Sequence, residues 1–404
     1  MKQFIGILLA ILFFFQLTLI NLTATAQALP LSPSQAIERL FTTTPLKSEW
    51  FASSFLKQIS LSQVERIINN IQQTLGTYQQ VQAVGENYQV VFEEGRVPTR
   101  IALNEQGQIT FLLFAPPEAK VMSLAEVVEQ LKALPGEVSF LAMRGDSTLA
   151  ELNADKPLAV GSAFKLAVIE TLRQQIAAGK RNWSDVVKLQ PSWKSLPSGI
   201  LQTWPDDTPL TLQTLATLMI SLSDNTATDA LIDILGRETI EPLTERNRPF
   251  LTTRELLALK NPQNKALLQR YREGDIEQKR QVLAETQSAP LPDATLFEGN
   301  PIATDVEWFF TSRELCNLME AVADLPIMSV NPGVANPENW QSVAFKGGSE
   351  PGVLNLTTWL TATDGTNYCL VVTQNDTNPI NEVSLITLYE SAIAGLGKGS
   401  IIDN

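Results

Sequence analysis

The chain has 404 residues, 44% of them hydrophobic, so it can bury a sizeable core and form two or three domains. Its formal net charge of -13 argues against a nucleic-acid partner, because binding a phosphate backbone requires clustered Lys and Arg side chains. The sequence contains no histidine, which excludes Ser-His-Asp and Cys-His catalysis and every metal site that depends on histidine. Any catalysis must therefore use another base, and we expect no metal and no other cofactor.

Residues 1–28 are typical of an export signal: a basic start, a nearly unbroken apolar run over 4–20, and small residues over 24–28. We predict a mature chain that begins near Gln27 or Leu29 and works in the periplasm or outside the cell. An uncleaved membrane anchor is the alternative, because the apolar run approaches spanning length. No later stretch is long and apolar enough to span a bilayer, so membrane contact would be limited to the signal segment.

Residues 29–116 are predicted to form a small α+β domain. The span 32–76 has helical periodicity, which indicates two or three helices. Helices packed on one face of an antiparallel meander would make this domain similar to cystatin or NTF2-like folds, and it contains no visible catalytic cluster. Pro116 and Pro117 then indicate a domain boundary. Short alternating strands are expected at 81–84, 88–92, 100–103 and 109–114.

The second domain, residues 117–404, contains the first candidate catalytic pair. Gly161 and the apolar run over 164–176 predict that Ser162 begins a buried helix, with Lys165 one turn further on the same face. Because histidine is absent, the serine needs another base, and a desolvated lysine can lose its charge near neutral pH. Alone, the Ser-x-x-Lys pattern is weak, since serine is a common helix cap. Before this pair we expect a helix at 124–134 and strands at 138–143 and 149–152.

Two further clusters strengthen the pattern. Ser223, Asp224 and Asn225 form a polar turn between apolar helical stretches, where a simple helix cap is the alternative interpretation. The run 345–352, which contains Lys-Gly-Gly, leads into strands expected at 353–362 and 368–372, and here a flexible turn is the alternative.

Ser-x-x-Lys, Ser-Asp-Asn and Lys-Gly-Gly, in this order, resemble the three motifs of class A β-lactamases and penicillin-binding proteins over about residues 124–396. The resemblance implies a β-lactamase/transpeptidase-like domain, in which an antiparallel sheet carries a helical subdomain. It implies that Ser162 is the acylated nucleophile and Lys165 its general base or proton relay. Ser223 and Lys346 would pass a proton to the leaving group.

The same resemblance implies the substrate-binding groups. Asn225 would orient the substrate amide, while Asp224 would brace its own turn. The backbone N–H groups of Ser162 and Ser349 would form the oxyanion hole. Gly348 would let the strand edge approach the substrate closely.

The sequence departs from the family pattern in two places. The usual Lys-Thr-Gly is Lys-Gly-Gly, so the hydroxyl that helps to hold a substrate carboxylate is missing, and Ser349 is a candidate to replace it. No Glu-x-x-Leu-Asn run, which supplies the deacylating glutamate of class A enzymes, lies between residues 225 and 346. A charged helical insertion at about 261–292 is predicted instead. Glu255 is expected to be an exposed structural residue of an amphipathic helix.

The segments 196–199, 201–205 and 249–256 are similar to a sub-family that includes a β-lactamase-like protein encoded with clavulanic acid biosynthesis genes. This resemblance implies esterase or amidase behaviour with weak or no β-lactam turnover. We therefore expect a small ester, amide or β-lactam-like substrate that acylates Ser162 and is released slowly. The alternatives are a D,D-peptidase acting on cell-wall peptides and a binding or sensor protein that is acylated without turnover.

Two pairs of other residues carry predictions about packing. Cys316 and Cys369 are too few for a disulfide framework or a zinc site, and we interpret them as unpaired core residues. Trp193 and Trp204 precede the Ser-Asp-Asn helix, and buried packing is favoured over a role in lining a cleft.

Overall fold

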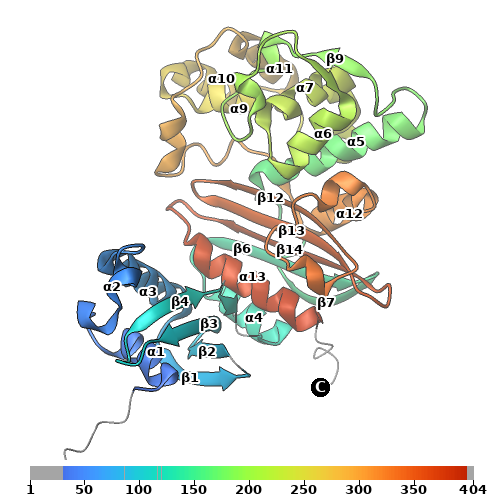
Figure 1. Cartoon of the computed structure of the whole chain (residues 1–404). Coiled ribbons are helices and arrows are strands. Elements are labelled where there is room, and N and C mark those ends of the chain that lie inside the picture. Colours follow the sequence, from blue (N-terminus) through green and yellow to red (C-terminus); the bar gives the residue numbers. More distant parts are fainter. Residues whose placement is uncertain (1–30, 86, 116, 120, 398–404) are drawn as a thin grey trace, which may run out of the picture. The chain divides into compact units, whose positions relative to one another are not determined.

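The structure, a computed structural model, describes residues 31–397 except 86, 116 and 120, so the predicted export signal lies outside the described residues. The chain divides into two compact units (Figure 1). The first holds the described residues of 31–69, 80–90 and 98–115, and the second holds the other described residues. None of the helices among the described residues combines the length and apolar character that a membrane span requires.

The N-terminal elements are helices followed by strands, as the change of hydrophobic period predicts. Ser32 caps the first helix, because its Oγ accepts the Gln35 N–H while the Gln35 side chain accepts the Ser32 N–H. The strand order is β1-β2-β3-β4, and β5 pairs with β3. The likeness to cystatin and NTF2-like folds stays a prediction. The bounds are α1 Pro33–Thr42, α2 Ser53–Leu56, α3 Leu61–Leu75, β1 Tyr78–Val84, β2 Asn87–Phe92, β3 Gly95–Leu103, β4 Ile109–Phe114 and β5 Glu118–Ala119.

The second unit is built on an antiparallel sheet of order β12-β13-β14-β6-β7. The sheet therefore joins two strands that come early in this unit, β6 and β7, to three that come late in the chain. Both groups of strands were expected from the sequence, and they meet in one sheet. Strand β12 lies at an edge. The bounds are β6 Glu137–Arg144, β7 Ser147–Leu152, β12 Ser342–Glu350, β13 Val353–Thr361 and β14 Asn367–Asn375.

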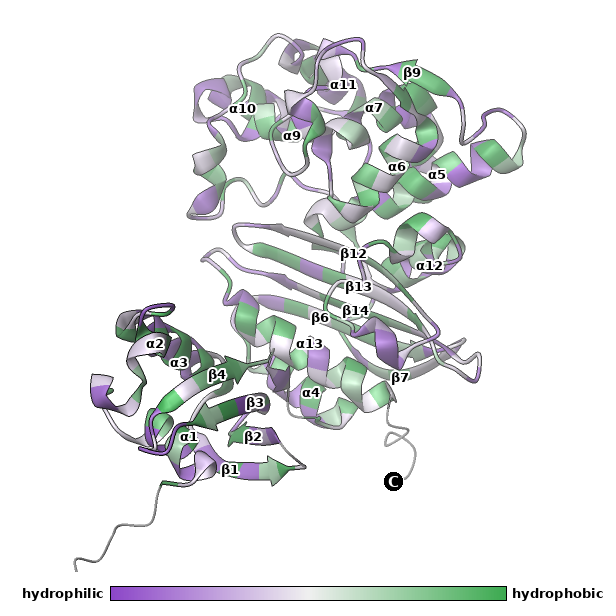
Figure 2. Ribbon diagram, in the orientation of Figure 1, coloured by the Kyte–Doolittle hydropathy of each residue, from purple (hydrophilic) through white to green (hydrophobic). Residues whose placement is uncertain are grey.

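Helices cover both faces of this sheet (Figure 1). On one face, α4 (Leu124–Lys132) and α13 (Glu382–Gly397) share an apolar cluster with Leu370 and Val372 of β14. On the other face, Val371 belongs to the cluster built around the helical subdomain. A strand buried on both faces carries an apolar run, as residues 369–372 of β14 do, and Figure 2 shows hydrophobic stretches along the strands of this sheet that are interrupted by polar ones. The predicted α+β class with an antiparallel sheet and a helical subdomain is confirmed.

The helical subdomain contains the predicted Ser-Asp-Asn turn, which lies between two buried helices, and the predicted charged stretch, which forms two helices. Two short ladders complete it: β8 pairs with β11, and β9 pairs with β10. The bounds are β8 Leu158–Ala159, α5 Lys165–Ala177, β9 Val186–Lys188, β10 Pro209–Thr211, α6 Leu212–Ser221, α7 Asn225–Leu235, α8 Arg237–Ile240, α9 Thr253–Lys260, α10 Lys265–Glu273, α11 Ile276–Thr286, β11 Phe309–Phe310 and α12 Ser312–Val322.

The prediction that the two cysteines are unpaired is wrong. Cys316 of α12 and Cys369 of β14 form a disulfide, with their Cα atoms 6.0 Å apart. Both residues are buried, as expected, but the packing of α12 on the sheet brings them together across 53 residues of sequence. The disulfide therefore ties the helical side of the unit to its central strand.

Candidate active site

Ser162 lies on a short turn that leads into helix α5. Residues Gly161–Phe164 form one turn of 3-10 helix, and Lys165 is the first residue of α5. The α-helix predicted from Ser162 thus begins three residues later than expected. Gly161 has a φ of 48°, a left-handed conformation that glycine adopts without strain. The ring of Phe164 stacks on Trp308 at 3.7 Å between centroids, which anchors the turn in the core.

Lys165 is fully buried and is held by the Ser-Asp-Asn turn. Its Nζ donates to the carbonyl oxygen of Ser223 at 2.7 Å, to Ser223 Oγ at 3.1 Å and to Asn225 Oδ1 at 2.8 Å. Burial, followed by the charge of Lys346, lowers the pKa of Lys165 well below its usual value. A lysine with a lowered pKa can act as a proton acceptor, which an exposed lysine cannot do near neutral pH.

Lys346 approaches the same serine from the edge strand β12. Its Nζ donates to Ser223 Oγ at 3.1 Å and to the carbonyl oxygen of Gly347 at 2.5 Å. Burial lowers the pKa of Lys346 to about 7. Ser223 Oγ therefore lies between two lysine nitrogens at the same distance, and a proton can move between them through one hydroxyl.

The Ser-Asp-Asn turn is fixed by its neighbours. Ser223 has a φ of 54°, a strained conformation for a serine, and its carbonyl oxygen also accepts the Ser198 hydroxyl at 2.6 Å. Asp224 caps α7 by accepting the Ala227 N–H at 2.9 Å, and its other oxygen accepts the N–H groups of residues 200 and 201. A Cβ at Gly199 would lie 2.3 Å from Asp224, so only glycine fits there.

Strand β12 passes directly beside the nucleophile. A Cβ at Gly348 would lie 2.2 Å from the Val160 carbonyl oxygen and 2.4 Å from the Ser162 nitrogen. The strand can approach this closely only because residue 348 has no side chain. The close approach brings the backbone around Ser349 next to the Ser162 amide.

The departure from Lys-Thr-Gly leaves room for the Phe345 ring. A Cβ at Gly347 would lie 2.9 Å from Cζ of Phe345 and 3.1 Å from the Asn355 carbonyl oxygen, so a side chain there requires the tip of the Phe345 ring to move. Ser349 lies two residues further along the strand and therefore on the same face as Gly347. It is an exposed residue that lines the cleft.

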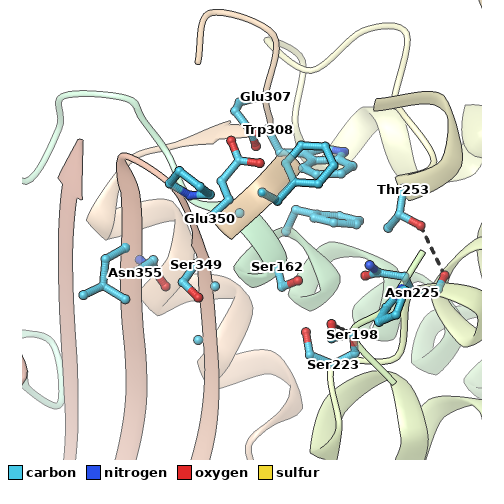
Figure 3. A pocket seen from close by; sticks show the side chains of 18 of the residues that line it. Ser162, Ser198, Ser223, Asn225, Thr253, Glu307, Trp308, Ser349, Glu350 and Asn355 are labelled. Carbon is cyan, nitrogen blue, oxygen red and sulfur yellow. Dashed lines mark hydrogen bonds between the residues drawn. The ribbon is translucent and has the colours of Figure 1, made fainter. Parts of the chain in front are cut away.

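One cavity of about 730 Å³ collects the candidate residues (Figure 3). Ser162, Ser223, Asn225, Lys346, Gly348 and Ser349 line it, whereas Lys165 lies beneath its wall. The cavity also contains residues to which sequence reasoning gave no role; they are Ser198, Ile220, Leu222, Leu256, Leu257, Phe297, Trp308, Asn331, Glu307 and Glu350. Of the described residues in the predicted insertion at 261–292, none lines this cavity.

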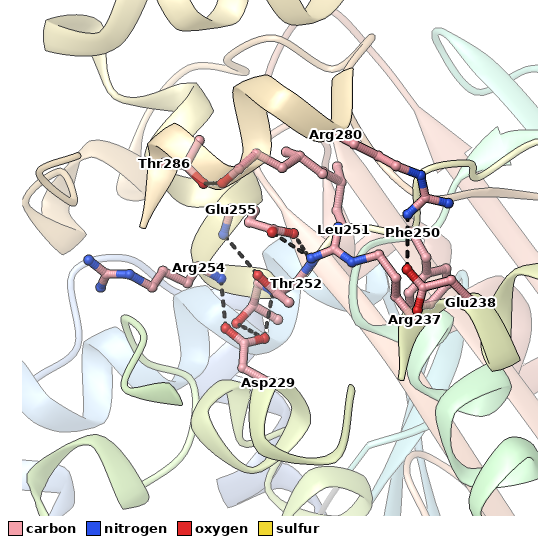
Figure 4. A network of polar contacts seen from close by, with 12 residues as sticks. Asp229, Arg237, Glu238, Phe250, Leu251, Thr252, Arg254, Glu255, Arg280 and Thr286 are labelled. Atoms are coloured by element: carbon pink, nitrogen blue, oxygen red, sulfur yellow. Dashed lines mark hydrogen bonds and ion pairs between the residues drawn. The ribbon is translucent and has the colours of Figure 1, made fainter. Parts of the chain in front are cut away.

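The expectation that Glu255 is exposed is wrong, although its structural role holds (Figure 4). The residue is 1% exposed, and its carboxylate pairs with Arg237 at 2.6 Å while accepting the Thr252 N–H at 2.8 Å. The neighbouring Asp229 accepts the Thr253 N–H at 2.7 Å, and burial raises the pKa of Asp229 to about 7. These contacts fix the start of α9, and neither carboxylate lines the cavity.

The two tryptophans are packed rather than placed in the cleft. Trp193 is buried and its Nε1 donates to Asp233 Oδ2 at 2.8 Å, while Trp204 packs against the core. Neither belongs to the described lining of the cavity, so the favoured prediction of buried packing is confirmed for Trp193, while Trp204 is half-buried.

An edge-strand cleft that joins a turn-borne serine to two buried lysines is the arrangement of an active-site serine hydrolase that works without histidine. A family model described as the beta-lactamase enzyme family matches residues 122–389. This match covers more than half of the chain, and the chain belongs to that family.

Solved structures of this type are similar to the same part of the chain. A beta-lactamase from Sphaerobacter thermophilus DSM 20745 is 21% identical, with 69% of this chain and 98% of that chain covered at a TM-score of 0.48. A class A beta-lactamase from Mycobacterium abscessus is 15% identical, with 69% and 100% covered at 0.47. A protein named PBP-A is 16% identical, with 70% and 99% covered at 0.46. A search of curated proteins found no match.

Proposed function

We propose that the protein is an exported hydrolase that forms an acyl-enzyme at Ser162 with a small ester, amide or β-lactam-like substrate and hydrolyses it slowly. The observation that carries this proposal is the position of Ser223 Oγ, 3.1 Å from both lysine nitrogens. This hydroxyl links a base beside the nucleophile to a second lysine on the edge strand. An acyl transfer needs both a proton acceptor for the nucleophile and a proton donor for the leaving group.

Acylation would proceed as follows. Ser162 Oγ attacks the substrate carbonyl carbon, and Lys165, whose pKa is lowered by burial, accepts the hydroxyl proton. When the tetrahedral intermediate collapses, the bond from the carbonyl carbon to the leaving group breaks. Lys346 then supplies a proton to the leaving group through Ser223. Asn225, whose Oδ1 accepts a hydrogen bond from Lys165, is suited to hold both that lysine and a substrate amide.

The oxyanion hole in this proposal is made of backbone N–H groups. Gly348 allows β12 to lie against the nucleophile turn, which brings the N–H of Ser349 near that of Ser162. Two such donors, together with the positive potential of Lys346, stabilise the charge that develops on the carbonyl oxygen.

Intact-protein mass spectrometry with penicillin G and with p-nitrophenyl acetate tests the proposal. We expect a covalent adduct of the acyl mass that is absent in Ser162→Ala, a variant that should unfold at the same temperature as the wild type. The absence of both an adduct and turnover with either probe would refute acylation. An adduct that never decays would favour an acylatable binding protein instead of an enzyme.

A cell-wall peptide is a second candidate substrate, because β12 is an edge strand. An edge strand offers unpaired N–H and C=O groups to an extended peptide, which can add to the sheet beside the nucleophile. Release of D-alanine from a stem peptide by the wild type, but not by Ser162→Ala, would assign D,D-peptidase activity. Ester turnover without D-alanine release would assign the small-substrate function.

The domain organisation belongs to the same proposal. We infer a cleaved export signal over residues 1–28, an N-terminal α+β domain over 29–116, and a hydrolase domain over 117–404 with a helical insertion at about 261–292. N-terminal sequencing of the exported protein should give a start near Gln27 or Leu29, whereas an intact N-terminus would indicate an uncleaved anchor. Limited proteolysis should cut first near the proline pair at 116–117, because exposed linkers are the preferred sites of cleavage.

A further inference from the structure

A buried ionic cluster of Lys260, Glu307 and Glu350 lies in the wall of the same cavity, and the acylation step does not use it. Lys260 Nζ, at the end of α9, donates to a carboxylate oxygen of Glu307 and to one of Glu350. The side chains of Lys260 and Glu307 are completely buried, while that of Glu350 is 14% exposed. Three buried charges are costly to keep, and replacing such a cluster with apolar residues is often neutral or stabilising. Its position in the cleft therefore needs an explanation other than stability.

Strand geometry places Glu350 on the same face of β12 as Gly348, the residue that touches the nucleophile turn. Side chains alternate along a strand, so Lys346, Gly348 and Glu350 share one face of β12. Gly348 is the residue that touches the nucleophile turn, and Glu350 lies about 7 Å further along the strand, on the side away from Lys346. In Figure 3, Ser162 lies between Ser223 on one side and the carboxyl group of Glu350 on the other.

The charges in the cluster suit proton transfer. Burial, followed by the adjacent Glu307 carboxylate, raises the pKa of Glu350 well above its usual value. Burial acts to lower the pKa of Lys260, but the charges of Glu307 and Glu350 have the larger effect, so the pKa of Lys260 is raised. Glu350 can thus take up and return a proton at a higher pH than an ordinary carboxylate. Glu307 Oε2 is buried and accepts no hydrogen bond from the described protein groups, which leaves an acceptor for a water molecule.

We propose that Glu350, held in place by Lys260 and Glu307, is the general base that activates water to hydrolyse the Ser162 acyl-enzyme. The inference rests on the proposed acylation of Ser162. Glu350 accepts a proton as the water oxygen bonds to the acyl carbonyl carbon. The bond between that carbon and Ser162 Oγ then breaks, and the proton returns to Ser162 Oγ. The products are the free acid and the free serine, so no other reactant is needed.

The test separates acylation from deacylation in the full mature chain. Using whichever of penicillin G and p-nitrophenyl acetate acylates the wild type, we would follow adduct formation and decay by mass spectrometry. Glu350→Gln should acylate within about twofold of the wild type, while its adduct should persist about 10²-fold longer or more. Glu298→Gln is the matched control, because Glu298 is an exposed glutamate of the same cavity, and its adduct should decay as in the wild type.

A second variant keeps the test decisive if Glu350→Gln unfolds. Glu350→Ala should also accumulate the adduct, and added formate, a small external base, should restore its decay. Less than tenfold lengthening of the adduct lifetime in a folded Glu350 variant would overturn the proposal, and so would a wild-type adduct that never decays. A wild type that shows neither adduct nor turnover refutes the acylation proposal instead, so the two failures can be distinguished.

Discussion

The contact between Gly348 and the nucleophile turn predicts that Gly348→Ala will disable acylation. The added methyl group would lie 2.4 Å from the Ser162 nitrogen, about 1 Å closer than the 3.4 Å at which ordinary van der Waals contact begins. The obstacle is backbone on both sides, so the strand must move away from the turn by about that distance. A misplacement of about 1 Å in a catalytic arrangement costs about 10²-fold in rate, and overpacking costs about 1–3 kcal/mol of stability.

The assay is the rate of covalent adduct formation at Ser162, measured beside thermal unfolding. Gly347→Ala is the matched control, because its methyl group points to the opposite face and meets the tip of the Phe345 ring, which can turn aside. We expect the Gly347 variant to keep acylation within about tenfold of the wild type. If Gly348→Ala acylates at the wild-type rate, the strand does not set the geometry of the oxyanion hole and this reasoning is wrong.

Three other predictions test the network around this site. Since Lys346 would supply a proton and its pKa is about 7, amide acylation should fall above that pH as Lys346 loses its charge. Lys346→Arg keeps the positive charge but cannot release a proton near neutral pH, so amide acylation should drop at every pH and the fall should disappear. A wild-type rate and pH profile in this variant would contradict the role. Replacing Cys316 and Cys369 by alanine opens a 53-residue loop and should cost about 4 kcal/mol in urea unfolding, whereas an equal midpoint would show that the disulfide contributes nothing. Glu255→Ala strips Arg237 of its buried partner and should cost roughly 3 kcal/mol of stability without changing the adduct lifetime. A longer lifetime would assign deacylation to Glu255.

Individual strands and helices could be predicted from the sequence because hydrophobic period and turn residues act locally, whereas their assembly into one antiparallel sheet was implied by the resemblance to class A β-lactamases and penicillin-binding proteins. The alternating strands at residues 353–362 and 368–372 appear as β13 and β14, with each end within three residues of the predicted one. The 3-10 turn at Ser162 was not predicted, because a turn of 3-10 helix and the start of an α-helix have the same short-range pattern. The disulfide was missed for another reason. Two cysteines 53 residues apart pair only if α12 packs on β14, and local sequence patterns do not reveal this tertiary packing.

In the candidate site, too, some residues could be found from local sequence patterns and others could not. Ser162 and Lys165 could be found from local spacing, and Ser223 and Lys346 from short motifs whose residues adjoin on one turn or strand. The burial of Glu255 could not be found, because an amphipathic helix shows one polar face whether solvent or a buried arginine meets it. Only the position of Arg237, on another helix, decides between the two.

The absence of a recognisable deacylation motif in the sequence is therefore weak evidence against turnover. A motif is visible when one loop carries the whole group, as the Lys-Gly-Gly run does on β12. The Lys260 cluster instead joins residues that are 47 and 90 positions apart, from the end of a helix, a loop and an edge strand. Glu350 has no sequence signature apart from its place two residues after Gly348. Side chains two residues apart on a strand point to the same side. Glu350 therefore faces the same side of β12 as Gly348, the residue that lies against the nucleophile turn. Lys346, proposed for acylation, and Glu350, proposed for deacylation, thus lie on one strand, but only Lys346 belongs to a motif that can be recognised in the sequence.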